Sequence, residues 1–205
     1  MAKIFNARDI TWLSFNERVM QEAKDPTVPL PLRIRFLGIF SNNLDEFFRV
    51  RVAGLKRAMD FKNKIISESF FAPPSKILAQ INDIVIKQQQ DFDSTWKDIQ
   101  VEMAKQNVYI KKATELTKEQ EHFVKNYFDE VVEADVIPIL LQENKPMPYL
   151  RDKSLYLGIA MRNKKWEYQS NFAIIEIPTR IIGRFVLLPS HNGEKNVMLL
   201  EDVIT

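Results

Sequence analysis

The segment Ser41-Asn42-Asn43-Leu44-Asp45-Glu46-Phe47-Phe48 places two amides and two carboxylates side by side within a stretch of helical periodicity. At about 100° per residue, one broad arc of this helix is apolar and is formed by Phe36, Leu37, Phe40, Leu44, Phe47, Phe48, Val52 and Leu55. The opposite arc is polar and is formed by Arg35, Asn42, Asp45, Glu46, Arg49 and Lys56. The pattern predicts a long amphipathic helix that packs against other elements through its apolar arc.

Three polar residues break this pattern. Asn43 lies at the edge of the apolar arc, and Arg33 and Arg51 lie within it, so all three need partners. In one interpretation, Asn43 hydrogen-bonds a neighbouring helix and the arginines extend their charged heads to water. In the other, Asn43 offers an amide donor and acceptor to a ligand such as adenine, with arginines nearby for phosphate oxygens. The spacing leaves both interpretations open.

Two further helices flank the central one. The first runs from about Asp9, a suitable N-cap, to Lys24, with an inner face of Trp12, Phe15, Val19, Met20 and Ala23. The central helix starts near Pro31 or Leu32 and fades around residues 59–63. The third opens at Pro73-Pro74 and carries an apolar stripe of Ile77, Leu78, Ile81, Val85, Phe92, Trp96, Ile99 and Met103. We expect a three-helix bundle with its aromatic residues mainly in the core, although Phe36, Phe40 or Phe47 could line a pocket rim.

The pattern changes after Asn107. A short strand at 108–110 precedes Thr117-Lys118-Glu119-Gln120, which has the form of a capping box and opens a helix to about Val132. Further apolar runs predict strands at 156–161, 172–177, 184–188 and 196–200. The fold class we predict is α+β, with a helical domain at 1–106 and a domain with a mainly antiparallel sheet at 107–205. Residues 199–205 resemble a strand leading into an unfinished helix, so we expect this second domain to be truncated.

Composition excludes several classes of protein. The chain has 205 residues, 45% of them apolar, a net charge of +2 and no cysteine. The absence of cysteine excludes a disulfide framework, and the near-neutral charge argues against broad nucleic-acid binding. No apolar run approaches the roughly 18 residues of a membrane span, and the N-terminus lacks a signal-peptide core, so we expect a cytoplasmic location. His122 and His191 lie in no nucleophile motif, and no glycine-rich phosphate loop or metal-ligand spacing occurs. We therefore expect no catalytic and no metal-binding residue in this chain.

Several segments nevertheless carry a resemblance. The segments Ile10–Val19 (ITWLSFNERV), Arg35–Ile39 (RFLGI), Ser41–Phe47 (SNNLDEF) and Val50-Arg51 resemble, in order and spacing, the start of type 1 polyphosphate kinases. The resemblance continues more loosely at 138–140, 174–178 and 197–202.

The resemblance implies an enzyme that reversibly transfers the terminal phosphate of ATP to polyphosphate through a phosphohistidine. In that family, the catalytic histidines and the Mg²⁺ ligands belong to two later domains with a phospholipase-D-like fold, and members are several times longer than this chain. We therefore expect an N-terminal fragment that is inactive alone.

The resemblance also suggests site residues and partners. Asn43 matches the second asparagine of the family's asparagine pair, which contacts ATP, and Arg51 and Arg49 are further candidates for nucleotide binding. The second region resembles the head domain, which contributes to dimer formation, so we expect a homo-oligomer. The sequence leaves peripheral membrane association open, because surfaces outside this chain could provide it. Two alternatives stay open: a structural and assembly module in which the asparagine pair orders helix packing, and a polyanion-binding module whose affinity falls steeply with salt.

Overall fold

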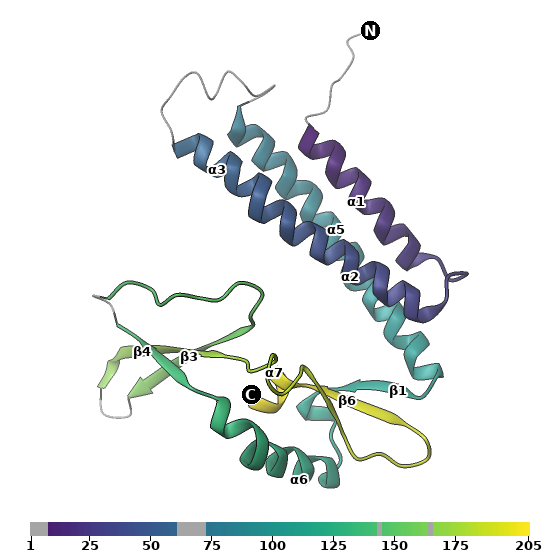
Figure 1. The fold of residues 1–205 in the computed structure, drawn as a ribbon, viewed down its shortest axis with the longest axis vertical. Helices are drawn as coiled ribbons and strands as arrows, with labels where there is room; N and C mark the ends of the chain where they lie inside the picture. The colour runs from purple at the N-terminus through teal and green to yellow at the C-terminus, as the bar shows by residue number, and fades with distance from the viewer. Residues whose placement is uncertain (1–7, 61–72, 143–144, 164–165) are drawn as a thin grey trace. The chain divides into compact units, whose positions relative to one another are not determined.

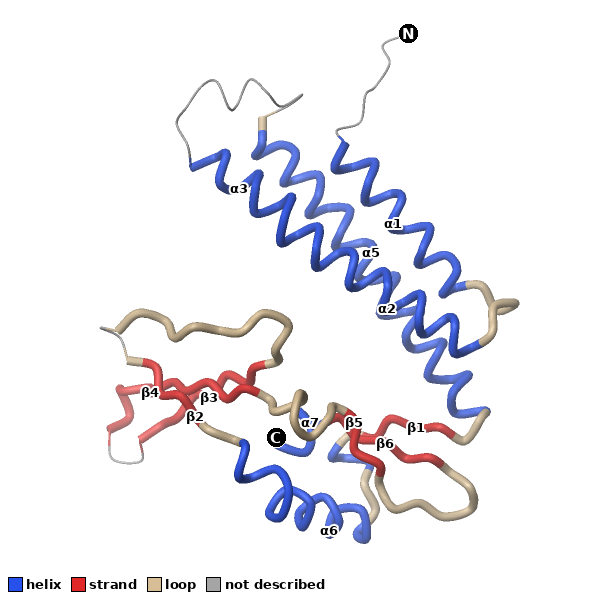
Figure 2. Tube along the Cα trace, in the orientation of Figure 1, coloured by secondary structure: helices blue, strands red, loops and turns tan. Residues whose placement is uncertain are grey.

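The computed structural model of the chain describes residues 8–60, 73–142, 145–163 and 166–205. It contains two compact units, Met1–Met103 and Ala104–Thr205, and each is described by itself below. Element labels follow Figure 1, and Figure 2 shows that helices make up the first unit whereas the second combines helices and strands.

The described residues of the first unit form three helical rods, and these pack as a bundle (Figure 1). The first rod is α1 (Arg8–Lys24), and the third is α5 (Pro74–Lys105). The second is continuous through α2 (Leu30–Phe47), a π-helical turn η1 (Phe48–Val52) and α3 (Ala53–Asp60). This arrangement confirms the predicted three-helix bundle.

A short turn joins α1 to α2. The Asp25 carboxylate accepts hydrogen bonds from the Thr27 backbone N–H at 2.8 Å and from the Thr27 hydroxyl at 2.7 Å. These two bonds lower the pKa of Asp25, the side-chain bond having the larger effect. Pro29 then stands immediately before α2, and its carbonyl accepts from the N–H groups of Leu32 and Arg33. Because the turn is short, α1 and α2 are antiparallel neighbours.

The predicted apolar faces form the core of this unit. One cluster consists of Leu13, Phe47, Val52, Leu55, Ile77, Ile81 and Val85, and the other of Met20, Ala23, Leu37, Phe40 and Ile99. The Trp12 ring is partly buried and stacks on Phe47, with centroids 4.7 Å apart. The prediction for Phe15 was wrong, because its side chain is 60% exposed and Leu13 and Asn16 face inward instead.

The π-helical turn η1 changes the phase of the second rod. A π turn holds one residue more than an α turn, so each later residue is displaced by about 100° from its position on an ideal helix. Val52 and Leu55, which the ideal helix also places on the apolar arc, lie in the core. Arg51, which the ideal helix places within the apolar arc, is turned toward the surface, and its side chain is 47% exposed.

The described part of the second unit contains two three-stranded sheets. In the first, the order is β1-β6-β5; β1 (Val108–Lys111) is parallel to β6 (Lys195–Leu199), and β5 (Phe185–Leu187) is antiparallel to β6. In the second, the order is β2-β4-β3, and β4 (Trp166–Glu176) pairs antiparallel with both β2 (Pro138–Leu141) and β3 (Tyr156–Asn163). The predicted α+β class with mainly antiparallel pairing is confirmed, but there are two sheets, one pairing is parallel, and β2 was not among the predicted strands.

Helical segments of this unit share a core with strands β5 and β6. The described helical segments are α6 (Lys118–Tyr127), its π-helical continuation η3 (Phe128–Val132), α7 (Leu200–Ile204) and two short 3₁₀ turns, η2 (Ala113–Glu115) and η4 (Glu133–Asp135). The predicted capping box is present: the Thr117 hydroxyl accepts from the Gln120 N–H, and the Gln120 side chain accepts from the Thr117 N–H. The core of this unit comprises Val132, Ile177, Val186, Leu188, Met198, Leu200 and Val203.

Candidate functional site

The candidate site lies along the contact between α1 and the second rod. Because these helices are antiparallel, residues early in α1 meet residues late in the second rod. Four polar contacts follow this seam: Arg33 Nε donates to the Ala23 carbonyl (2.8 Å), Asn16 Nδ2 to the Phe40 carbonyl (3.1 Å), Asn43 Nδ2 to Asn16 Oδ1 (3.0 Å) and Arg51 Nε to Asp9 Oδ1 (2.7 Å). Each polar residue that broke the helical pattern therefore has a partner on α1.

Asn43 is half-buried, and its partner Asn16 is fully buried. The amide of Asn16 connects two points of α2, since it donates to Phe40 and accepts from Asn43. Asn16 was not among the predicted site residues. Its signal in the sequence is the spacing of Leu13, Asn16, Met20 and Ala23, in which an asparagine occupies an inward position of α1.

An open groove of about 380 Å³ lies near the start of α1, lined by Arg8, Asp9, Trp12, Glu46, Phe47, Val50 and Arg51. The stacked Trp12 and Phe47 rings provide an apolar wall, and Arg51 provides a positive charge. Phe47 is thus the predicted aromatic residue that lines a pocket, whereas Phe40 is fully buried. Asn43 lies one helical turn before Glu46 and Phe47 but does not itself line the groove.

Arg51 is held in place by Asp9. The Asp9 side chain is only 6% exposed, and its carboxylate accepts from Arg51 Nε. This hydrogen bond is the main cause of the raised pKa of Arg51; burial opposes it, and the charge of Asp9 adds to it. Asp9, predicted as an N-cap, lies within the first turn of α1, and its carboxylate pairs with Arg51.

The other two arginines differ in their surroundings. Arg49 forms an ion pair with Asp45 one turn earlier, at 2.9 Å, and it does not line the groove. Arg33 is buried, and it does not extend its head to water as the first interpretation of the sequence suggested. Arg33 therefore has a packing role between α1 and α2.

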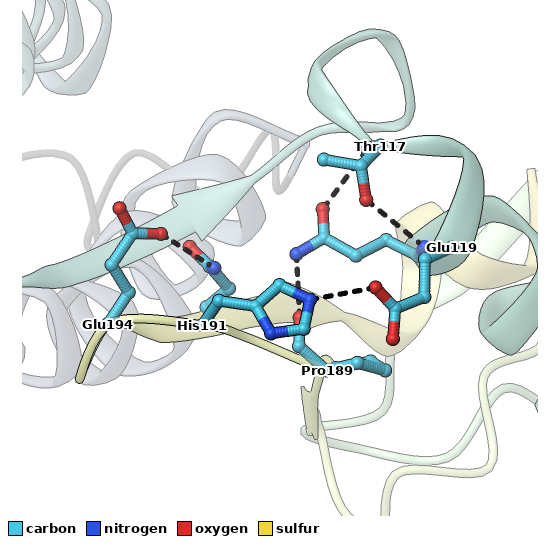
Figure 3. A network of polar contacts seen from close by, with 7 residues as sticks. Thr117, Glu119, Pro189, His191 and Glu194 are labelled. Atoms are coloured by element: carbon cyan, nitrogen blue, oxygen red, sulfur yellow. Dashed lines mark hydrogen bonds and ion pairs between the residues drawn. The ribbon is translucent and has the colours of Figure 1, made fainter.

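The two histidines lie in the second unit. His191 is in the connection between β5 and β6, where Asn192 and Gly193 adopt positive φ, and its Nε2 lies 2.9 Å from the Glu119 carboxylate (Figure 3). Gln120, the neighbour of Glu119 in the chain, donates from Nε2 to the Pro189 carbonyl at 2.8 Å. These contacts fasten the β5–β6 connection to the start of α6. His122 is exposed, and its Nε2 lies 3.3 Å from Asn126 Nδ2.

The described residues contain neither a metal-ligand cluster nor a membrane-spanning helix. In 8–60, 73–142, 145–163 and 166–205, no group of three or more histidine, aspartate or glutamate side chains is placed to hold a metal ion. Within the same ranges, no helix combines the length and apolar character needed to cross a membrane.

Comparisons with known proteins cover almost the whole chain. The sequence model of the polyphosphate kinase N-terminal domain matches residues 5–111, and that of the polyphosphate kinase middle domain matches residues 119–205. Similar curated proteins include the polyphosphate kinases of Vibrio cholerae, 39% identical over 205 residues, and of Bacillus anthracis, 38% identical over 213 residues. In each case the match covers 98% of this chain and 28% or 29% of the relative. The crystal structure of polyphosphate kinase from Porphyromonas gingivalis is also similar, with a TM-score of 0.85 and 30% identity, covering 100% of this chain and 30% of that one.

Proposed function

The chain belongs to the polyphosphate kinase family, and on this premise we propose that its two units form the N-terminal and middle parts of an ATP:polyphosphate phosphotransferase. The proposal rests on one observation: the two domain models match in order and together account for most of the chain. The reaction we assign to the complete enzyme is reversible transfer of the terminal phosphate of ATP to polyphosphate through a phosphohistidine.

In this proposal the 205 residues take no covalent part in the reaction. The chain spans 28–30% of the length of the relatives named above, and we assign the phosphohistidine and the Mg²⁺ ligands to residues beyond those matched here. His122 and His191 are both exposed, and His191 is paired with Glu119, so neither is our candidate for the phosphorylated histidine.

The role we propose for the helical unit is to contact the nucleotide through Asn43. One hydrogen of Asn43 Nδ2 is used by Asn16. Asn43 Oδ1 has no partner among the described residues and is not one of the buried unpartnered atoms there, so it reaches solvent. Arg51 lines the groove about two turns further along the same rod and is our candidate for phosphate or ribose contact. Arg49 is the weaker choice, because Asp45 already neutralises it.

A second candidate role is purely structural, and the hydrogen bond from Asn43 to Asn16 favours it. In that case Asn43 orders the packing of α2 on α1 and has no nucleotide contact. The two roles predict different consequences for the same substitution, since a packing residue affects stability and a ligand contact affects the Michaelis constant.

The experiment is Asn43→Ala in a polyphosphate kinase that contains these residues. A nucleotide contact predicts that KM for ATP rises about 10-fold, the equivalent of one hydrogen bond of about 1.4 kcal/mol, while kcat and the melting temperature change little. Asn42→Ala is the matched control, because Asn42 is the adjacent amide and is exposed. An unchanged KM with a lowered melting temperature would favour the structural role and reject the contact.

We also propose that the second unit contributes a dimer surface. The edge strand β5 supports this proposal, because Phe185 and Leu187 point away from the core and are 66% and 70% exposed. An edge strand with exposed apolar side chains tends to associate with another chain.

A further inference from the structure

We propose that Asn16 is a positioning residue that fixes which atom of Asn43 faces the ligand, and thereby makes the site select a 6-amino purine over a 6-oxo purine. The inference rests on the proposed contact between Asn43 and the nucleotide. It goes further, because it assigns a base preference to the site and attributes that preference to Asn16, a residue that does not contact the ligand.

The orientation of Asn16 is set by the backbone of α2. The Phe40 carbonyl oxygen lies 3.1 Å from Asn16 and can only accept a hydrogen bond, so Asn16 must present Nδ2 to it. The Asn16 side chain is fully buried, and no water competes for its amide. A rotation that exchanges its oxygen and nitrogen would bring two acceptors together in a desolvated position, which disfavours that state by about 10-fold or more.

The orientation of Asn16 in turn sets that of Asn43. With Nδ2 of Asn16 committed to Phe40, its Oδ1 faces Asn43 and can only accept. Asn43 must therefore present Nδ2 toward Asn16, which it does at 3.0 Å. The acceptor Oδ1 and the second hydrogen of Asn43 Nδ2 remain for a ligand, with Oδ1 on the side of the amide away from Asn16.

A fixed amide of this kind distinguishes purines by their exocyclic group. Adenine carries an amino group at position 6, which donates, beside ring nitrogens that accept, and this matches a free Oδ1 with an adjoining N–H. Hypoxanthine carries a carbonyl at position 6, which would face Asn43 Oδ1 as a second acceptor. A freely rotating asparagine would simply turn over to satisfy hypoxanthine, whereas Asn43 cannot do so without breaking its bond to Asn16.

The test uses ATP and inosine triphosphate, whose bases differ only in the exocyclic group at position 6 and the proton on the adjoining ring nitrogen. KM is measured for both in a polyphosphate kinase that contains these residues, with Asn16→Leu and Asn16→Asp as the variants. Asn16→Leu removes both hydrogen bonds. In Asn16→Asp, burial raises the pKa of the introduced carboxyl, so the neutral acid can donate to Phe40 and accept from Asn43 as the amide does.

For the parent enzyme we expect a preference for ATP of about 10-fold in KM. Asn16→Leu should reduce this preference to about 2-fold or less, with a smaller effect on kcat, because Asn43 is then free to turn over. Asn16→Asp should keep the preference even if it lowers the melting temperature. A merely structural role of Asn16 predicts that both variants change stability without changing the ratio of the two KM values.

Each result bears on the inference. An unchanged preference in folded Asn16→Leu, or a lost preference in Asn16→Asp, would overturn it. If Asn16→Leu does not fold, Asn16→Ala, which also removes both hydrogen bonds, takes its place, and an unchanged preference in that variant overturns the inference. A failure of the proposed contact itself is seen separately, because Asn43→Ala would then leave KM for ATP unchanged.

Discussion

The ion pair between Asp9 and Arg51 should stabilise the helical unit, and its contribution follows from the unequal burial of its partners. Asp9 is 6% exposed and Arg51 is 47% exposed. Removing one partner of a fully buried pair costs about 3–5 kcal/mol, because a charge remains buried without compensation. Water and salt reach the exposed half of Arg51 and reduce this value, so for Arg51→Met we expect a loss of about 2 kcal/mol. In a unit of about 100 residues, this loss lowers the melting temperature by about 10 °C.

The assay is urea denaturation followed by circular dichroism at 222 nm, because urea is uncharged and does not screen the pair. Asp9→Asn, Arg51→Met and the double variant complete a thermodynamic cycle, for which we expect a coupling energy of about 1 kcal/mol that decreases with added salt. Lys24→Met is the control, since the pair of Lys24 with Asp91 is exposed on both sides and should contribute at most about 0.5 kcal/mol. Additive effects of Asp9→Asn and Arg51→Met, or equal losses for Arg51→Met and Lys24→Met, would refute this reasoning.

Two further predictions concern the second unit. Burial, and then the charge of Glu201, raise the pKa of Asp202, so the Asp202 carboxylate destabilises the folded state at neutral pH. Asp202→Asn should therefore raise the melting temperature at pH 7, and this gain should disappear as the pH falls below about 4. Burial raises the pKa of Glu201, but the hydrogen bond from Arg184 and further smaller effects outweigh burial, so the pKa is lowered overall. Glu201→Gln should therefore destabilise the folded state at pH 7 and have less effect on its stability below about pH 4.5. For the proposed dimer, replacing both Phe185 and Leu187 with serine should shift the mass measured by light scattering from dimer to monomer, while an unchanged mass would exclude β5 from the interface.

Local patterns in the sequence were sufficient to predict much of the fold. The apolar arc of the central helix and the stripe of the third helix are buried as their spacing indicated, and Thr117 and Gln120 form the predicted capping box. The ion pair of Asp45 with Arg49 was also predictable, because its partners are one turn apart on the same helix. Each of these features depends on residues within a few positions of each other, so helical or strand geometry alone brings them together.

The features that sequence periodicity missed depend on the geometry of more than one turn or element. The π-helical turn displaces Arg51 from the apolar arc, and an ideal helical wheel cannot represent an inserted residue. The parallel pairing of β1 with β6 joins segments more than 80 residues apart, and such pairings leave no local signal. The prediction for Phe15 failed for a related reason, because several residues of α1 have suitable spacing and only the position of α2 decides which of them face inward.

The sequence by itself determined the two-part α+β organisation, the helical placement of the asparagine pair and the polar residues that needed partners, because these follow from periodicity and residue type. Only the tertiary structure decided which groups are those partners: Asn16 for Asn43, Asp9 for Arg51 and the Ala23 carbonyl for Arg33. A side chain's need for a hydrogen bond is a local property, but the group that satisfies it is selected by the register of two antiparallel helices, and that register is fixed by packing across the whole bundle.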